Sequence, residues 1–241
     1  FKAEGITDLI LDLRFNNGGS VELARYLAAS IAGTSHRSDV FMKMQRSSGA
    51  DEYIRFGDGD DLNLNSVRII CSEETASASE LIINGLRGID FPVKLFGSRT
   101  EGKNVGMEVQ EYKYGNKYYE FAPITFRSFN AKDWGDYADG IDPDVMLNNQ
   151  NSSYEDDIDN VFPYAFGDWD NFDFNYPLYW ALCDVQGVDP TTGEPVKRSG
   201  RSGMTRSQQD EIIRVPSVPL KRPVGTFGSL IYNKPEVENL Y

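Results

Sequence analysis

Short apolar runs alternate with segments of helical periodicity along the first part of the chain. Residues 7–14 form a mostly apolar run that stops at the glycine-rich segment 16–19, which predicts a buried strand followed by a turn. Apolar residues then recur at helical spacing over 21–31, with Ser20 as the expected helix cap and Gly33 as the expected helix end. A strand, a glycine turn and a helix in this order are typical of a βα unit.

The same alternation continues to about residue 128. An antiparallel pair of strands is expected from 105–112 and 117–128, joined around Gly115-Asn116. Because strands alternate with helices, the fold class is α/β, with a largely parallel sheet and an antiparallel edge. The other expected elements are strands at 40–46, 52–57, 67–71 and 93–97, and a helix that starts near 75–77.

The composition changes after about residue 146. Residues 148–176 are acidic and aromatic, 178–185 fit a short packing helix, and 188–209 are polar and rich in Gly, Ser and Thr, as in a mobile loop. We therefore expect a core of residues 1–147 and an acidic, aromatic, loop-rich extension of residues 148–241 that packs on it.

The charge balance limits the partners. The chain of 241 residues carries a formal net charge of −13, from 37 acidic and 24 basic residues. This excludes a nucleic-acid partner, because phosphates require a basic surface, and it disfavours anionic membranes. No apolar run approaches the roughly 20 residues that a membrane span needs.

Cysteine and histidine are too few to indicate a metal site. The chain has two cysteines and one histidine, without the clustering that ligand spacing requires, so we expect no metal and no cofactor. Cys71 ends an apolar run, which favours a buried free thiol over a disulfide with Cys183.

Ser77 lies between a predicted buried strand and a predicted helix. A serine on such a turn presents its hydroxyl at the sheet edge, where backbone N–H groups at the helix start can stabilise an oxyanion. The alternative is purely structural: Ser77 with Glu80 fits S-x-x-E, a capping box in which the serine only satisfies backbone donors.

A nucleophilic serine needs a base. His36 lies in a polar stretch and is expected to be exposed, so a Ser-His-Asp triad has little support. A lysine can serve when burial lowers its pKa, and Lys103 lies in the glycine-containing segment 97–103. A solvated loop lysine is the alternative; a phosphate loop is disfavoured because the spacing is wrong and Asn104 follows.

Three separated pieces, in order, resemble the carboxyl-terminal processing proteases, also called tail-specific proteases. They are the strand and glycine turn at 9–19, Thr75-Ala76-Ser77-Ala78-Ser79-Glu80, and Gly97-x-x-Thr100-x-Gly102-Lys103. A weaker match is Gly140-Ile141-Asp142-Pro143-Asp144-Val145, and the resemblance covers residues 5–146.

The resemblance implies roles for individual residues and a fold. The fold would be a crotonase-like (ClpP/crotonase-type) spiral of ββα units with an irregular C-terminal extension. The implied roles are nucleophile for Ser77, general base for Lys103, oxyanion-hole N–H groups from Ala78 and from Gly18 or Gly19, and support from Glu80 and Thr100.

The implied function is that of a serine endopeptidase that cleaves protein or peptide substrates through a Ser/Lys dyad and an acyl-enzyme. The implied location is the bacterial periplasm or cell surface. In the family a PDZ-type module and part of the core precede the strand at 7–14. We therefore expect such a module in the full-length chain but not in this one, and weak or no activity from this chain alone.

Two positions depart from the family pattern, and two other functions stay open. Gly88 stands where many members have an aspartate, and Met107 where some have a glutamine, so the group that orients Lys103 is unidentified. A catalytically silent member of the fold that binds peptides or a partner is the first alternative. Calcium-dependent adhesion is the second, but Asp168, Asp170 and Asp173 lack the glycine and glutamate of a calcium loop.

Overall fold

The computed structural model describes residues 1–47, 49–147 and 172–196. These residues form a mixed α/β fold with two four-stranded sheets and a two-stranded ribbon. In chain order the elements are η1 Lys2–Glu4, β1 Asp8–Asp12, α1 Val21–Ala32, η2 Thr34–His36, β2 Val40–Arg46, β3 Glu52–Arg55, β4 Ser66–Cys71, α2 Ala78–Gly88, β5 Val93–Gly97, β6 Val105–Met107, β7 Gln110–Tyr114, β8 Lys117–Phe121, β9 Ile124–Phe129, β10 Val145–Met146 and α3 Phe172–Gln186.

The first sheet is parallel throughout, in the order β1-β4-β5-β10. Its strands are short apolar runs because both faces of the sheet are covered. Leu9, Val67 and Leu95 point into the main core, whereas the alternate positions Ile10 and Phe96 point to the opposite face. The expected strands at 7–14, 67–71 and 93–97 are therefore confirmed.

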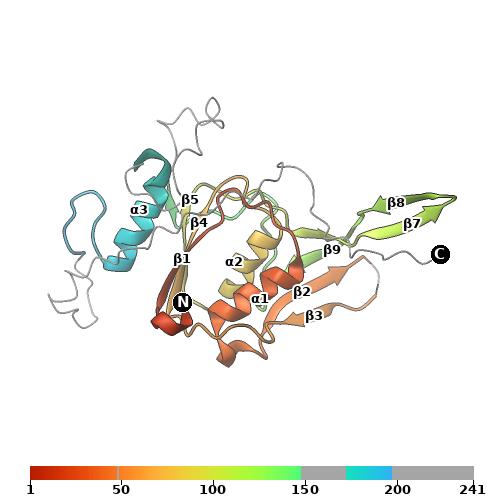
Figure 1. Ribbon diagram of the computed structural model, residues 1–241, viewed down its shortest axis with the longest axis horizontal. Coiled ribbons are helices and arrows are strands. Elements are labelled where there is room, and N and C mark those ends of the chain that lie inside the picture. The colour runs from red at the N-terminus through yellow and green to blue at the C-terminus, as the bar shows by residue number, and fades with distance from the viewer. Residues whose placement is uncertain (48, 148–171, 197–241) are drawn as a thin grey trace.

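The second sheet is antiparallel, in the order β3-β2-β9-β6, and α1 and α2 lie between the two sheets (Figure 1). The expectation of antiparallel strands at the edge of one sheet is wrong in this respect, because they form a sheet of their own. The reason lies in α2, whose residues are buried nearly all round. A helix buried on every side needs cover on both faces, and α2 contacts β5 on one side and β2 on the other.

The expected end signals of the first helix are confirmed. Ser20 caps α1 by accepting the Leu23 N–H at 3.4 Å, and Gly33 ends it with a φ of 81°. Cys71 and Cys183 are buried free thiols, as expected for Cys71. Burial raises the pKa of Cys71 to about 12, so this thiol stays protonated and inert.

The hairpin expected at 105–128 is present but divides into two parts. Its base, β6 with β9, belongs to the antiparallel sheet. Beyond a register shift between Gly106 and Met107, β7 and β8 form a separate ribbon that turns at residues 115–116. We call this ribbon, residues 110–121, the arm; it projects from the body on the side away from α3 (Figure 1).

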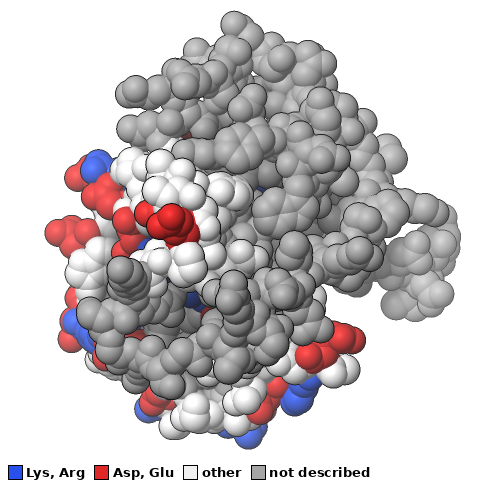
Figure 2. All heavy atoms as spheres, turned by 90° about the vertical axis from the view of Figure 1, so that its left-hand side faces the viewer, with Lys and Arg blue, Asp and Glu red and all other residues white. Residues whose placement is uncertain are grey.

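Helix α3 covers the outer face of the parallel sheet, where it contacts β1, β4 and β5. This confirms the packing helix expected at 178–185. Ala181 and Trp180 pack with Phe96 and Ile10 in a small second core. Figure 2 looks onto this side of the molecule, where Asp and Glu form several patches on the described surface.

Only part of the acidic extension is described. Residues 188–196, the start of the expected mobile loop, close a hydrogen-bonded turn in which Gly193 N–H donates to Asp189 O at 2.8 Å. The rest of that loop lies outside the described residues, as do Asp168 and Asp170 of the calcium hypothesis, and the Asp173 side chain is not described either. Within the described ranges, no helix is long and apolar enough to cross a membrane.

An ion-pair cluster joins α3 to the sheet. Asp184 accepts from Arg68 Nε at 2.9 Å and from the Lys94 ammonium. Burial alone would raise the pKa of Asp184, but the hydrogen bonds and charges of Lys94 and Arg68 hold it below its ordinary value of 3.8. The charged form of Asp184 therefore stabilises the docked helix.

We predict that Asp184→Asn lowers the free energy of unfolding by about 1–2 kcal/mol at neutral pH, because hydrogen bonds between charged groups are lost. Since the folded pKa is depressed, the difference from wild type should persist above about pH 3.8 and disappear as the pH falls through the folded value. Urea unfolding across this pH range measures it. Asp58→Asn removes an exposed pair with Arg37 and should cost almost nothing; an equal cost for both variants would contradict the prediction.

Candidate active site

The carboxyl ends of β1, β4 and β5 meet at one edge of the parallel sheet. The segments that follow them, 13–20, 72–77 and 98–103, are tied together by hydrogen bonds. Leu13 O accepts from Thr75 Oγ1 at 2.6 Å, and Thr75 O accepts from the Glu101 N–H at 3.0 Å. The parallel topology therefore brings the three family-like pieces together at this edge.

Ser77 sits on a strained turn between β4 and α2. Its φ of 54° and ψ of −116° are unusual for a residue with a side chain. Such strain persists only where the surroundings impose it, and it is frequent at functional sites. Ser77 is half-buried, so its side chain remains accessible at the N-terminus of α2.

The glycine turn after β1 packs directly on this serine. A Cβ at Gly18 would lie 2.7 Å from Ser77 Cβ and 2.8 Å from Ala78 N, so only glycine allows the contact. Asn16 fixes the turn: its carbonyl accepts the Ala76 N–H at 3.2 Å and the Ser79 hydroxyl at 3.0 Å. The Asn-x-Gly-Gly segment and the serine turn thus form one packed unit.

Glu80 connects the serine turn to the lysine loop. Its carboxylate is completely buried. Oε2 accepts the backbone N–H of Ser77 and that of Lys103, both at 2.9 Å. The two backbone nitrogens share one acceptor atom and so cannot be further apart than the sum of these two bonds.

The other oxygen of Glu80 holds the loop before the lysine. Oε1 accepts the Thr100 hydroxyl at 2.6 Å and the Gly102 N–H at 2.8 Å. Thr100 Oγ1 in turn accepts the Ile141 N–H at 2.7 Å, which attaches the closing segment before β10. The capping box of Ser77 with Glu80 is present as well, so Glu80 both caps α2 and organises the site.

Gly102 lets the lysine loop approach the backbone behind it. Its φ is 96°, and a Cβ there would lie 2.4 Å from Ala138 O and from Gly140 N. Lys103 itself is half-buried. Among the described residues, no Asp or Glu forms an ion pair with its amine, and such a pair would favour the charged ammonium.

Asn104, the residue after Lys103, is held by hydrogen bonds to both its backbone carbonyl and its side-chain amide. Its carbonyl accepts the Ser128 N–H at 2.9 Å and the Ser128 hydroxyl at 3.0 Å, while its own amide donates to Gly135 O at 2.7 Å. Because the Ser128 hydroxyl donates to Asn104, the Tyr137 hydroxyl must be the donor in the 2.9 Å bond between Ser128 and Tyr137. Burial raises the pKa of Tyr137 to about 12, so this donor keeps its proton.

The backbone donors near Ser77 differ in their availability. Gly18 N–H donates to Asn16 Oδ1 at 3.0 Å, whereas neither Gly19 N–H nor Ala78 N–H has a hydrogen-bond partner among the described residues. Of the two glycines expected as alternatives, Gly19 therefore has the N–H that is free to bind an oxyanion.

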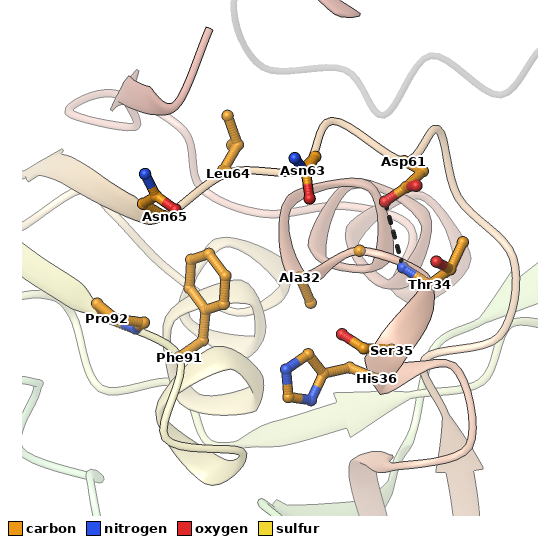
Figure 3. A pocket seen from close by; sticks show the side chains of 11 residues that line it. Ala32, Thr34, Ser35, His36, Asp61, Asn63, Leu64, Asn65, Phe91 and Pro92 are labelled. Atoms are coloured by element: carbon orange, nitrogen blue, oxygen red, sulfur yellow. Dashed lines mark hydrogen bonds between the residues drawn. The ribbon is translucent and has the colours of Figure 1, made fainter. Parts of the chain in front are cut away.

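His36 lies elsewhere. It lines a hollow of about 390 Å³ beside Phe91 and Pro92, formed where α1 ends and where β4 and β5 begin (Figure 3). This is the edge of the parallel sheet opposite to Ser77. The side chain is half-buried rather than exposed as expected, and it hydrogen-bonds Asp39 at 2.8 Å.

The two departures from the family pattern have structural reasons. A Cβ at Gly88 would lie 2.9 Å from Asn130 Cβ and 3.0 Å from Ala131 N, so a side chain has no space there. Met107 is 43% exposed beside the register shift of the hairpin. Neither position offers a group that orients Lys103.

Sequence reasoning did not predict the hydrogen bonds made by four residues around the site: Asn16, Asn104, Ser128 and Tyr137. Asn16 belongs to a motif that was recognised, but its bonds depend on a segment 60 positions away. Ser128 and Tyr137 meet Asn104 only through the fold, and no spacing rule links them. In the part of the chain that the structure describes, no cluster of His, Cys, Asp and Glu could hold a metal ion.

We predict that Glu80→Gln destabilises the protein by about 2–4 kcal/mol. The Gln side chain has the shape of the carboxylate, but its NH2 group is a hydrogen-bond donor. In place of either Glu80 oxygen, this NH2 group would face two buried donors and leave them without an acceptor. Urea unfolding measures the loss. Glu74→Gln, at an exposed position in the same segment, is the matched control and should change stability by less than about 0.5 kcal/mol. Similar values for both variants would contradict the role of Glu80.

We predict that Gly88→Ala destabilises by about 1–3 kcal/mol, because the added methyl group meets Asn130 and Ala131. The sign of the change in stability tests the lack of space, because in an open helix the same Gly-to-Ala substitution stabilises by about 0.5–1 kcal/mol. Thermal unfolding is the measurement, and an unchanged or raised Tm would show that space exists for a side chain at this position.

Comparisons with known proteins identify the family of the chain. The model of peptidase family S41 matches residues 1–147. A "Probable CtpA-like serine protease" of Staphylococcus haemolyticus is 26% identical over 147 residues, which are 60% of this chain and 28% of that protein. Its counterpart in Staphylococcus aureus is 27% identical over 170 residues, which are 69% of this chain and 32% of that protein.

A solved structure from Bacteroides fragilis, named "Putative S41 protease", superposes with a TM-score of 0.62 at 24% identity, over 78% of this chain and 46% of that one. At this identity the likeness shows the fold. The chain spans about a third of the length of the curated relatives it matches. Because the family model covers more than half of the chain, the resemblance to the carboxyl-terminal processing proteases is confirmed, and the chain belongs to peptidase family S41.

Proposed function

We propose that residues 1–147 are the core of a serine endopeptidase that works through a Ser77–Lys103 dyad. One observation carries the proposal. A single buried carboxylate oxygen, Glu80 Oε2, accepts the backbone N–H groups of both residues at 2.9 Å, so two segments 26 positions apart are held side by side. A structural cap needs only the serine; it does not require a lysine loop on the same oxygen.

The reaction proceeds by acyl transfer. Neutral Lys103 accepts the Ser77 hydroxyl proton as the oxygen attacks the peptide carbonyl, and the Ala78 and Gly19 N–H groups stabilise the oxyanion. Lys103 then gives the proton to the leaving amine, and an ester on Ser77 remains. Water, deprotonated by Lys103, attacks this ester and restores the serine.

The surroundings supply what this chemistry needs. Ser77 lies at the N-terminus of α2, where unpaired N–H groups favour developing negative charge. The backbone of Lys103 is fixed by Glu80 on one side and through Asn104 on the other. No step uses a metal or a cofactor.

The proposal also covers the fold family of the core and the parts of the protein outside the described residues. We assign the ClpP/crotonase-type spiral to the core, and residues 148–241 to an extension that packs on it, as α3 does. From the family resemblance we expect protein substrates, a PDZ-type module in the full-length protein, and a place in the bacterial periplasm or at the cell surface.

A catalytically silent, peptide-binding member of the fold is the second candidate. The observation that favours it is that no recorded hydrogen bond or ion pair holds the Lys103 amine among the described residues. A silent protein would bind peptides at the same edge without reacting with them.

We predict that a fluorophosphonate labels Ser77, and that Ser77→Ala abolishes this labelling. Lys103→Met keeps much of the side-chain volume but removes the base, so labelling and peptide hydrolysis should fall by about 10³-fold or more. His36→Ala should leave both within about twofold. Mass spectrometry of the labelled protein identifies the modified residue.

Dialysis against a strong chelator is expected to leave labelling unchanged. Labelling that survives in Lys103→Met but disappears in His36→Ala would overturn the mechanism. Peptide binding without any labelling would favour the silent member of the fold.

A further inference from the structure

The arm exposes an unusual number of aromatic side chains. Every residue of β7 and β8 is exposed, and the ribbon contacts no other sheet. A two-stranded hairpin is marginally stable in water by itself, and large apolar patches on a surface mark interaction sites. The most exposed aromatic side chains of the arm are Tyr112, Tyr114, Tyr118 and Phe121, at 60%, 71%, 58% and 56%.

The register of the ribbon sorts these side chains onto two faces. Residues opposite each other share a face, and faces alternate along a strand. The pairs on one face are Tyr112 with Tyr119, Gln110 with Phe121, and Tyr114 with Lys117; those on the other are Glu111 with Glu120, and Lys113 with Tyr118. We call the first the tyrosine face; it carries four of the five aromatic side chains of β7 and β8.

The edges of the ribbon are open as well. Beyond the β7–β8 pairing, the strands of the arm make no recorded backbone hydrogen bond to another described segment. Unpaired N–H and C=O groups on an edge are a template for one more strand, and side-chain pockets at alternate positions select what binds. An extended polypeptide fits this arrangement, whereas a helix or a small molecule would use neither the edge nor the alternation.

The arm is also close to the proposed site along the chain. It continues the hairpin whose first strand, β6, begins two residues after Lys103 and forms the edge of its sheet. Gln110 is seven positions after Lys103, so the base of the arm lies within about 25 Å of the lysine. An extended segment of about eight residues spans this distance.

The charges disfavour a second copy of this chain as the occupant. Two lysines, Lys113 and Lys117, balance Glu111 and Glu120, so the arm is neutral on a chain of net charge −13. Two such chains repel each other, whereas a basic polypeptide is attracted to the acidic body and a neutral one is not repelled. The like-charged pair of Glu111 and Glu120 across the ribbon would further favour a basic side chain beside it.

We infer that the tyrosine face docks extended segments of unfolded polypeptides, an inference that rests on the proposed peptidase function. Apolar side chains at alternate positions of the segment pack on Tyr112 and Tyr119, and its backbone adds to an open edge of the arm. The bound segment holds the substrate near Lys103, so docking lowers KM for long unfolded substrates and leaves short peptides unaffected.

The two faces supply a matched pair of variants. Tyr112→Thr on the tyrosine face and Tyr118→Thr on the polar face remove the same side chain at nearly equal exposure, and threonine preserves strand propensity. Both are made in the Ser77→Ala protein, where cleavage cannot interfere. Fluorescence anisotropy measures binding of labelled, reduced and carboxamidomethylated lysozyme, an unfolded basic polypeptide. We expect Tyr112→Thr, alone or together with Tyr119→Thr, to weaken binding of the polypeptide by about tenfold. Tyr118→Thr should weaken it by less than about twofold.

The inference would be overturned if the substitutions on the two faces weakened binding equally, or if neither substitution changed binding. Sedimentation velocity data in which the unmodified chain is a dimer that Tyr112→Thr dissociates would overturn it as well, since the face would then bind a second copy. Because binding is measured without catalysis, a failure of Ser77 labelling alongside face-selective binding would refute the peptidase reaction and leave the docking face standing.

Discussion

Glu80 carries a charge that cannot reach water, and the geometry of the site follows from how that charge is satisfied. A buried carboxylate is tolerated only when donors surround it, and here four donors do so, three from the lysine loop and one from the helix start. Each donor is thereby fixed relative to the other three. The carboxylate therefore ties the serine turn to the lysine loop by hydrogen bonds at this edge of the sheet.

Close approach of backbone segments is the second constraint. Gly18 lies against the serine turn, and Gly102 lies against the segment at 138–140, at distances that no Cβ would permit. At both contacts two backbone segments lie closer together than a side chain between them would allow. The glycines of the family-like motifs are therefore explained by distances in the structure, since they let three loops converge within reach of one carboxylate.

The sequence predicts the elements well and the way they pack less well. The strands at 67–71 and 93–97 and the helix capped by Ser20 follow from local periodicity, so one chain was sufficient to find them. The second sheet could not be predicted, because it depends on α2 being buried on both sides, which is a tertiary property. Ser77, Lys103 and Glu80 were proposed as site residues from motif order and stay a prediction, whereas the Glu80 oxygen shared by the Ser77 and Lys103 N–H groups is visible only in the structure.

The structure also bears on how Lys103, the proposed base, is positioned without an orienting side chain. At Lys103 the described contacts are made by the backbone: Glu80 takes its N–H, and the next residue is held by Ser128 and Gly135. Fixing the backbone on both sides confines where the flexible side chain can go without adding a charged partner, which would hold the amine as an ammonium. The glycine at position 88 is consistent with this arrangement, since a side chain there would meet Asn130 and Ala131. A dyad positioned through the main chain is therefore a coherent alternative to a triad positioned by a third side chain.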